Sequence, residues 1–227
     1  MEIKIPKWKR WLSYLFEVHI ESAGAEVNPF LYVSMKKGRF QLSTDKAVYS
    51  YDDLYDNFTT AFEALDMQRF NPESVLILGL GLASVPYILE TKYKKLPYYT
   101  AVELDEEVIY LAEKYRLGSM QSSVQCVAAD AEVFVSICQD SFDLIVIDLF
   151  IDDVIPEAFL SLTFMEQISE LLEDGGLLMF NHLGMNESQE QQVDKYMEEV
   201  LLKIFPEASY IPTRNNRILL NHRQFLK

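Results

Sequence analysis

Cysteine and histidine are scarce in this sequence, with two and three copies among 227 residues. Cys126 and Cys138 have no short paired spacing, and His19, His182 and His222 stand far apart along the chain. These intervals exclude a disulfide scaffold and the usual zinc-ligand patterns. We therefore expect no bound metal, and two reduced thiols of the kind found in cytoplasmic proteins.

Long hydrophobic runs are also missing. The longest apolar stretch, Val75 to Leu89, is broken by two glycines, a serine and a proline, and it is shorter than the roughly 20 residues that span a bilayer. The basic first ten residues resemble the start of a signal peptide, but Glu17 interrupts the apolar part that follows. The sequence thus predicts no targeting signal and no membrane partner.

Basic residues are in deficit, since 20 Lys and Arg face 35 Asp and Glu for a net charge of −15. The imbalance is concentrated in the middle of the chain, where residues 41–202 carry −22, while residues 1–40 carry +3 and residues 203–227 carry +4. A body this acidic repels phosphate backbones, which argues against nucleic acid as a partner. The 49% hydrophobic content excludes intrinsic disorder.

The first fifty residues have the pattern of short strands. Short runs rich in β-forming residues lie at 30–34, 39–43 and 47–49, with Lys-Lys-Gly at 36–38 as a turn. We expect residues 1–50 to form a small β-hairpin region, which is also a candidate dimer contact. From Tyr51 the period becomes helical and predicts a helix to about Arg69.

The rest of the chain alternates strands with helices. Apolar runs predict strands at 75–78, 98–103, 124–128, 143–148, 177–181, 208–211 and 217–220. The intervening segments have helical spacing, including a long one over 159–172 that we expect to end at Gly175 and Gly176. This order predicts an α/β fold for residues 51–227, with a doubly wound, mostly parallel, seven-stranded Rossmann-like methyltransferase sheet.

A glycine-rich turn follows the first of these strands. Gly79 and Gly81 lie between that strand and a helix for which Ser84 is the predicted cap, and such glycines let the backbone approach a ligand. Glu103 ends the next strand, about two dozen residues after the glycine-rich turn. A carboxylate at that spacing can accept the hydroxyls of a ribose. Together the three positions favour an adenosine-type cofactor.

Two further acids end strands of the same sheet. Asp130, between Ala129 and Ala131, is placed to accept the amino group of an adenine, and it is also a candidate helix cap. Asp148 ends a predicted buried central strand, where burial is costly unless the carboxylate binds a positive group. A sulfonium or an amine nucleophile would meet that need.

From Arg39 to about Asn181 these motifs resemble the class I AdoMet-dependent transferases, and within them the spermidine synthase superfamily. Val75-Leu-Ile-Leu-Gly-Leu-Gly81 resembles the family's cofactor loop, Val102 to Ile109 its ribose-binding strand, and Ala129-Asp130-Ala131 its adenine contact. The resemblance implies that Gly79, Gly81, Glu103, Asp130 and Ala131 bind the donor. No metal is implied.

The same resemblance suggests the acceptor side. Phe40-Gln41 and Tyr49 to Leu54 resemble the family's entrance segment, and Asp148 falls at the position of its catalytic aspartate. The spacing from Asp148 to Pro156 is similar to the D-A-F-x-x-D-x-I-P form of spermidine-synthase-like members. The implied acceptor-binding residues are Gln41, Tyr51, Asp52 and Asp153.

Two departures bear on the donor and the acceptor. Leu82 stands where spermidine synthases have the acid of a GGGDGG loop, which holds the ammonium group of decarboxylated AdoMet. Ile151 stands where polyamine enzymes have a second acid, and we find no counterpart of their C-terminal aromatic. Losing the acid at position 82 removes a reason to prefer the decarboxylated donor.

The sequence thus predicts a group transferase that uses AdoMet or decarboxylated AdoMet as co-substrate and acts on an amine acceptor, with methyl transfer favoured. One alternative is a genuine aminopropyltransferase that uses decarboxylated AdoMet. Another is a nucleoside-binding relative that has lost catalysis, because two loops are altered. An NAD-dependent oxidoreductase is disfavoured, since Ser84 replaces the third glycine of the dinucleotide fingerprint and no proton relay is evident.

Overall fold

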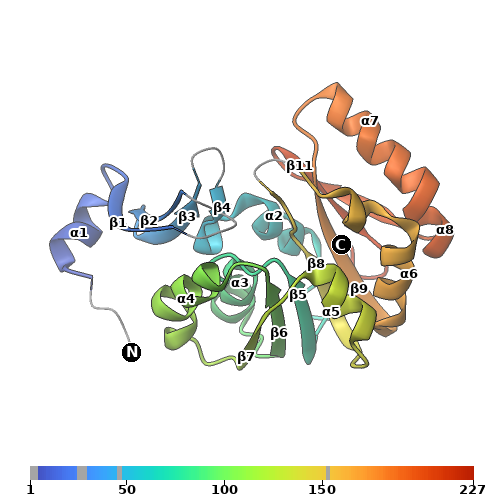
Figure 1. The fold of residues 1–227 in the computed structure, drawn as a ribbon, viewed down its shortest axis with the longest axis horizontal. Coiled ribbons are helices and arrows are strands. Elements are labelled where there is room, and N and C mark those ends of the chain that lie inside the picture. The colour runs from blue at the N-terminus through green and yellow to red at the C-terminus, as the bar shows by residue number, and fades with distance from the viewer. Residues whose placement is uncertain (1–4, 25–29, 45–47, 152–153) are drawn as a thin grey trace.

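Two β-sheets organise the chain, which the computed structural model describes over residues 5–24, 30–44, 48–151 and 154–227. Figure 1 shows the small sheet and the helix α1 (Lys7–Leu12) toward one end of the long axis. The large sheet and the helix α7 (Glu187–Tyr196) lie toward the other end.

The small sheet is antiparallel, with its strands in chain order: β1 (Val18–Ala23), β2 (Leu31–Lys36), β3 (Arg39–Ser43) and β4 (Val48–Ser50). The predicted hairpin is confirmed, since Lys37 and Gly38 both have positive φ and join β2 to β3. Of the third predicted strand, Ala47 lies outside the described residues. The sequence did not predict α1, which buries no residue and so has no core-facing period.

The large sheet has seven strands in the order β10-β11-β9-β8-β5-β6-β7. They are β5 (Ser74–Leu78), β6 (Tyr98–Glu103), β7 (Val124–Ala128), β8 (Phe142–Ile147), β9 (Leu172–Leu183), β10 (Ser209–Pro212) and β11 (Asn216–Leu220). The pairs from β9 to β7 are parallel, and β11 is antiparallel to both its neighbours. The predicted doubly wound α/β fold is confirmed.

Helices cover both faces of this sheet, and each face has its own core. Residues of α2 (Asp56–Ala64), α3 (Ser84–Tyr93) and α4 (Glu106–Tyr115) pack on one face, against Val75 and Ile77. Residues of α5 (Ala131–Ile137), α6 (Leu162–Glu170) and α7 pack on the other, against the alternate positions of β5. After α7 the chain continues through a π-helical turn into the short α8 (Leu202–Ile204). This alternation is what a strand buried on both faces requires.

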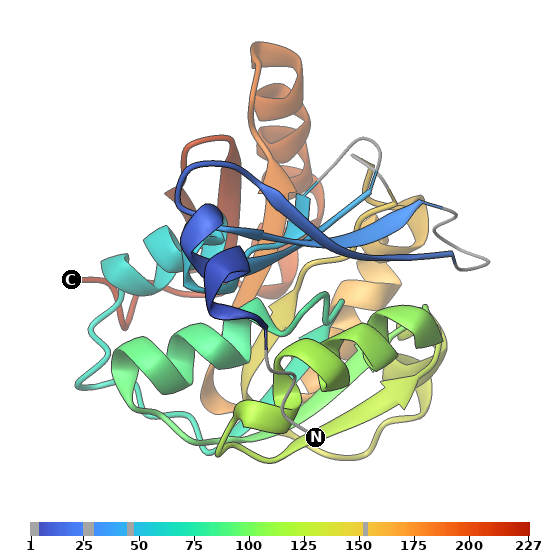
Figure 2. The same cartoon turned by 90° about the vertical axis from the view of Figure 1, so that its left-hand side faces the viewer.

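The small sheet shares the first of these cores. Leu31, Val33, Met35 and Leu42 belong to the same buried cluster as Val75 of β5. In Figure 2 the blue strands of the small sheet lie beside the green helices α3 and α4. The division into residues 1–50 and 51–227 stays a prediction.

Two predicted helices are shorter than expected. The helix predicted over 51–69 is confirmed only for α2, and the one over 159–172 only for α6. Ser161 caps α6 by accepting a hydrogen bond from the Phe164 amide at 3.1 Å, which separates it from the turn before it. The glycine pair at 175–176 lies within β9 rather than at a helix end.

Candidate active site

A cavity of about 730 Å³ lies where the parallel strands end, between the large sheet, the start of α2 and the small sheet. Ligands of open α/β sheets bind at this edge. Most of the site residues expected from the sequence line it, namely Gln41, Tyr51, Gly79, Gly81, Glu103, Asp130, Ala131 and Asp148. Asp153 lies outside the described residues.

The glycine-rich turn is shaped by neighbours that leave no room for a side chain. Gly79 has φ +92°, and a Cβ there would fall well inside contact distance of the Asp148 carbonyl oxygen. Gly81 has φ +53°, and its Cβ would lie 3.1 Å from the Cβ of Ser50. Glycine is therefore required at Gly79 by both space and backbone conformation.

Ser84 does not cap α3, contrary to expectation, because Ala83 before it adopts a left-handed conformation. The Ser84 hydroxyl shares a hydrogen bond with Ser50 Oγ at 2.6 Å and accepts one from the Tyr51 amide at 3.1 Å. It therefore ties the glycine-rich turn to β4 of the small sheet and to the segment that follows it.

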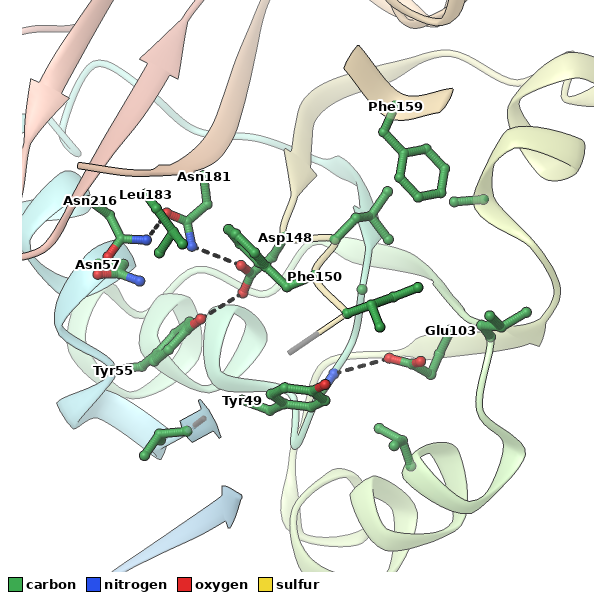
Figure 3. Close-up of a pocket in the computed structure, with 18 of the residues that line it drawn as sticks. Tyr49, Tyr55, Asn57, Glu103, Asp148, Phe150, Phe159, Asn181, Leu183 and Asn216 are labelled. Carbon is green, nitrogen blue, oxygen red and sulfur yellow. Dashed lines mark hydrogen bonds between the residues drawn. The ribbon is translucent and has the colours of Figure 1, made fainter. Parts of the chain in front are cut away.

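Glu103 faces the glycine-rich turn from the end of β6. Its Oε2 accepts hydrogen bonds from the amides of Leu80 at 3.1 Å and Gly81 at 3.5 Å, and its Oε1 accepts one from Asp105 at 3.2 Å. Burial raises the pKa of Glu103, and the three backbone donors oppose that rise. The carboxylate is thus held in place on the cavity wall, as Figure 3 shows.

Asp130 is both a helix cap and a wall residue. Its carboxylate accepts hydrogen bonds from the amides of Glu132 at 2.8 Å and Val133 at 3.2 Å, and so caps α5. Leu149, Pro156 and Phe159 line this same cavity and supply apolar surface. A flat aromatic group bound here would meet apolar walls and one carboxylate edge.

Asp148, just after β8, is held by two side chains, and a third side chain supports one of these two. The Tyr55 hydroxyl donates to its Oδ2 at 3.0 Å, and Asn181 Nδ2 donates to its Oδ1 at 2.8 Å. Asn216 Nδ2 in turn donates to Asn181 Oδ1 at 2.9 Å (Figure 3). These bonds fix the orientation of the carboxylate on the cavity wall.

The electrostatics of Asp148 suit proton transfer near neutral pH. Burial raises its pKa to about 6, the Asn181 and Tyr55 donors act in the opposite direction, and the Glu103 charge raises it further. The pKa of Tyr55 is raised well above its ordinary value by burial and by the Asp148 charge. Tyr55 therefore stays protonated and remains a donor.

The sequence did not indicate Tyr55, Asn181 or Asn216. Asn181 follows the apolar run of β9 just as Asp148 follows β8, so the rule that polar residues at strand ends line the site applies to it. Its amide is uncharged, so its residue type carries no signal of a site. Asn216 begins an antiparallel strand, where that rule gives no signal.

The structure does not bring Asp52 or Leu82 to the cavity. Asp52 is fully buried, and its carboxylate pairs with Arg116 and accepts a hydrogen bond from the Phe40 amide at 2.8 Å. Leu82 is fully buried in the hydrophobic core, between two glycine-rich-turn residues with positive φ. Its side chain therefore offers no surface to a ligand in the cavity.

Over the described ranges, no group of three or more His, Cys, Asp or Glu side chains is arranged to hold a metal ion. Within the same part of the chain, no helix has the length and apolar character needed to cross a bilayer.

Comparison with known proteins identifies relatives of one kind. A family model described as the spermine/spermidine synthase domain matches residues 57–221. A polyamine aminopropyltransferase of Vibrio vulnificus is 31% identical over 113 residues, which are 48% of this chain and 38% of that protein. A probable polyamine aminopropyl transferase of Bifidobacterium longum is 25% identical over 153 residues, 66% of this chain and 33% of that protein. The matched segments thus span less than half the length of these relatives.

Solved structures show the same fold. Spermidine synthase from Thermotoga maritima has a TM-score of 0.67 at 17% identity, over 89% of this chain and 72% of that one. Human methyltransferase-like protein 13, in complex with SAH, has a TM-score of 0.59 at 20% identity, over 75% of this chain and 83% of that one.

Proposed function

Because the chain belongs to the spermine/spermidine synthase family, we propose that it is an aminopropyltransferase that moves the aminopropyl group of decarboxylated AdoMet to an amine. The observation that carries this proposal is the environment of Asp148. It combines a carboxylate of raised pKa, two fixed donors and a position on the cavity wall.

The reaction needs a nucleophile with a free lone pair and a base that takes one proton. The amine nitrogen attacks the propyl carbon next to the sulfonium, a carbon–nitrogen bond forms, and the carbon–sulfur bond breaks with its electron pair going to sulfur. The neutral thioether leaves as methylthioadenosine. Asp148, ionised at neutral pH because its pKa is about 6, takes the proton that the new ammonium loses.

The donor site proposed from the sequence fits the cavity on the other side of Asp148. Glu103 would accept the ribose hydroxyls in place of some of its backbone donors, and Asp130 would face the adenine amino group. Gly79 would allow the backbone to approach the donor closely. The chain would thereby supply alignment and proton removal, with no covalent intermediate.

The preference for methyl transfer finds no support. It depended on Leu82 replacing an acid on the donor's wall, and Leu82 instead lies in the hydrophobic core. The relatives from Vibrio vulnificus and Bifidobacterium longum, which were found by sequence similarity, are both named as aminopropyltransferases. Aminopropyl transfer, the alternative from the sequence, is therefore the activity we propose.

The decisive experiment compares the two donors on one preparation of the full chain. With decarboxylated AdoMet and a panel of mono-, di- and triamines, we expect release of methylthioadenosine by at least one amine. With AdoMet and the same amines we expect no S-adenosylhomocysteine. Asp148→Asn should lower kcat by about 10²–10⁴, the range typical of losing a general base.

Each other outcome has a definite meaning. Release of S-adenosylhomocysteine alone would establish methyl transfer and refute the proposal. Binding of methylthioadenosine, measured by thermal shift, without turnover of either donor on any amine would favour a nucleoside-binding protein without catalysis.

A further inference from the structure

Among the described residues, the most deeply buried ion pair joins Asp52 and Arg116, and Asp52 lies in the turn between Tyr51 and Tyr55. Asp52 is fully buried and Arg116 is 9% exposed, and Arg116 Nη2 donates to Asp52 Oδ2. Asp52 Oδ1 and Arg116 Nε have no hydrogen-bond partner. Removing either charge would leave the other buried and unpaired, so the two residues depend on each other.

Arg116 is fixed by aromatic rings as well as by Asp52. Its guanidinium lies 4.0 Å from the ring centroid of Tyr87 and 5.2 Å from that of Phe40. It directly follows α4, whose start is three residues after Glu103. Arg116 therefore joins the end of α4 to the turn between Tyr51 and Tyr55.

Asp52 shapes that loop through its backbone. It has φ +43°, a conformation that a side chain rarely adopts without being held there. The turn it forms is closed by bonds from the Leu54 amide to the Tyr51 carbonyl at 2.9 Å and from the Tyr55 amide to the Asp52 carbonyl at 3.4 Å. Tyr51 and Tyr55, which flank this turn, both line the cavity.

We propose that the Asp52–Arg116 pair is a positioning device for the active site: it holds the Tyr51–Tyr55 turn so that the Tyr55 hydroxyl meets Asp148. The distance from Tyr55 Oη to Asp148 Oδ2, 3.0 Å, is the contact through which the pair acts. Neither member of the pair lines the cavity, so the role is indirect. The kinetic part of this inference rests on the proposed function, while the spectroscopic part does not.

Arg116→Met tests the pair, and Lys114→Met is the matched control. Lys114 lies in the last turn of α4, two residues before Arg116, and forms an ion pair with β1 of the small sheet, its Nζ 2.7 Å from Glu21 Oε1, rather than with the Tyr51–Tyr55 turn. We expect Arg116→Met to lower kcat by roughly a hundredfold, the cost of a misplacement of about 1 Å, with a smaller change in KM. Lys114→Met should leave kcat within about twofold of the parent.

A double variant shows whether the effect passes through Tyr55. If it does, Arg116→Met added to Tyr55→Phe should cost far less than it does alone, because the contact is already lost. Equal costs in both backgrounds would overturn the proposal. Should Arg116→Met fail to fold, Arg116→Lys keeps the charge that Asp52 needs and allows the same comparison.

A titration of Asp148 tests the pair without any turnover. In protein labelled with ¹³C-aspartate, the carboxyl signal of Asp148 is identified by its loss in Asp148→Asn. Two titratable groups act on this carboxyl, Tyr55 by donating to it and Glu103 by its charge. Arg116→Met should raise the pKa of Asp148 above about 6, because the Tyr55 donor that lowers it is displaced. An unchanged titration in a folded variant would overturn the proposal even if the chain proved to be no transferase.

Discussion

At the scale of single residues, Glu103 and Asp148 differ in what donates to them. Glu103 accepts three backbone amides, whereas Asp148 accepts a tyrosine hydroxyl and an asparagine amide. Burial raises the pKa of both. Side-chain donors can be changed by substitution and backbone donors cannot, so Asp148 is the carboxylate whose properties mutation can adjust.

Asp148→Asn should stabilise the protein at neutral pH. The folded-state pKa of Asp148, about 6, lies above the ordinary 3.8, so the native chain binds a proton more tightly than the unfolded chain does. Its favourable contribution is complete below about pH 4 and is lost as pH rises through 6. At pH 8 we expect the variant to be more stable by as much as about 3 kcal/mol, measured by urea unfolding.

The pH series supplies its own control, because both proteins are uncharged at this position near pH 3. The stability difference should therefore vanish there. A variant that is less stable than the parent at every pH would contradict the assignment of a raised pKa to Asp148.

Gly79→Ala should be costly and Gly175→Ala should not. A Cβ at Gly79 meets the Asp148 carbonyl, while a Cβ at Gly175 has nothing within 4 Å, although both glycines have positive φ. We expect losses of roughly 3 kcal/mol or more for Gly79→Ala and about 1 kcal/mol for Gly175→Ala in thermal unfolding. Similar losses for the two would mean that the close approach of Asp148 is unimportant.

The sequence indicated site residues where charge and position coincide. Glu103 and Asp148 are acids at the ends of apolar strands, so both features were visible. Asn181 has the position without the charge, and Asp52 has the charge but is turned inward by a partner, Arg116, that lies far along the chain. Contacts between side chains so far apart in the sequence cannot be predicted from the spacing of neighbouring residues.

At the scale of elements, strand ends and helix starts meet at the cavity. The turn after β7 shows this best, because Asp130 there begins α5 and faces the proposed adenine site with the same carboxylate. Capping would thus be combined with the proposed ligand contact in one side chain, and substitution can separate the two roles.

Asp130→Asn and Asp130→Ala separate the two tasks. Asparagine caps a helix as well as aspartate does, so Asp130→Asn should keep the thermal stability of the parent, while Asp130→Ala should lose about 1 kcal/mol. Both variants should bind methylthioadenosine more weakly in calorimetry, because both remove the carboxylate. Parental affinity in Asp130→Asn would show that the charge at this position is not used for the adenine.

Helices and strands were predictable where burial of one face imposes a regular spacing of apolar residues along the sequence. The strands β6 and β7 were expected at the bounds they have, since both are apolar runs between turn residues. The helix α1 exposes Trp8 and Trp11 at 62% and 68%, so its aromatic residues gave no core-facing pattern. Ser161 lies within a segment of helical spacing, and the sequence alone does not distinguish a serine inside a helix from one that caps it. The capping hydrogen bond in the structure makes that distinction.

At the scale of the whole molecule, acidic side chains outnumber basic ones in the lining of the cavity as they do in the chain. Among the described residues that line it, Asp56, Glu103, Asp130, Glu132 and Asp148 are acidic and Lys36 is basic. A concave site lined by one sign of charge concentrates ligands of the opposite sign. The acidic lining of the cavity would therefore favour the approach of the cationic amine that we propose as acceptor.

Salt should weaken this attraction. Raising the ionic strength from about 0.05 to 0.5 M should increase KM for a cationic amine by roughly threefold to tenfold and leave kcat within about twofold. Uncharged methylthioadenosine serves as the control, since its affinity should change little. Equal shifts for both ligands would mean that the charge of the cavity does not act on the amine.

The core shared by the two sheets has a consequence for how the molecule opens. Leu31, Val33, Met35 and Leu42 are buried together with the central strand β5, so detaching the small sheet would expose the interior of the large one. Such a structure unfolds cooperatively, and its amide protons in β2 and β5 should exchange at similar rates. Under the proposed function, substrates would therefore reach the cavity without detachment of the small sheet from β5.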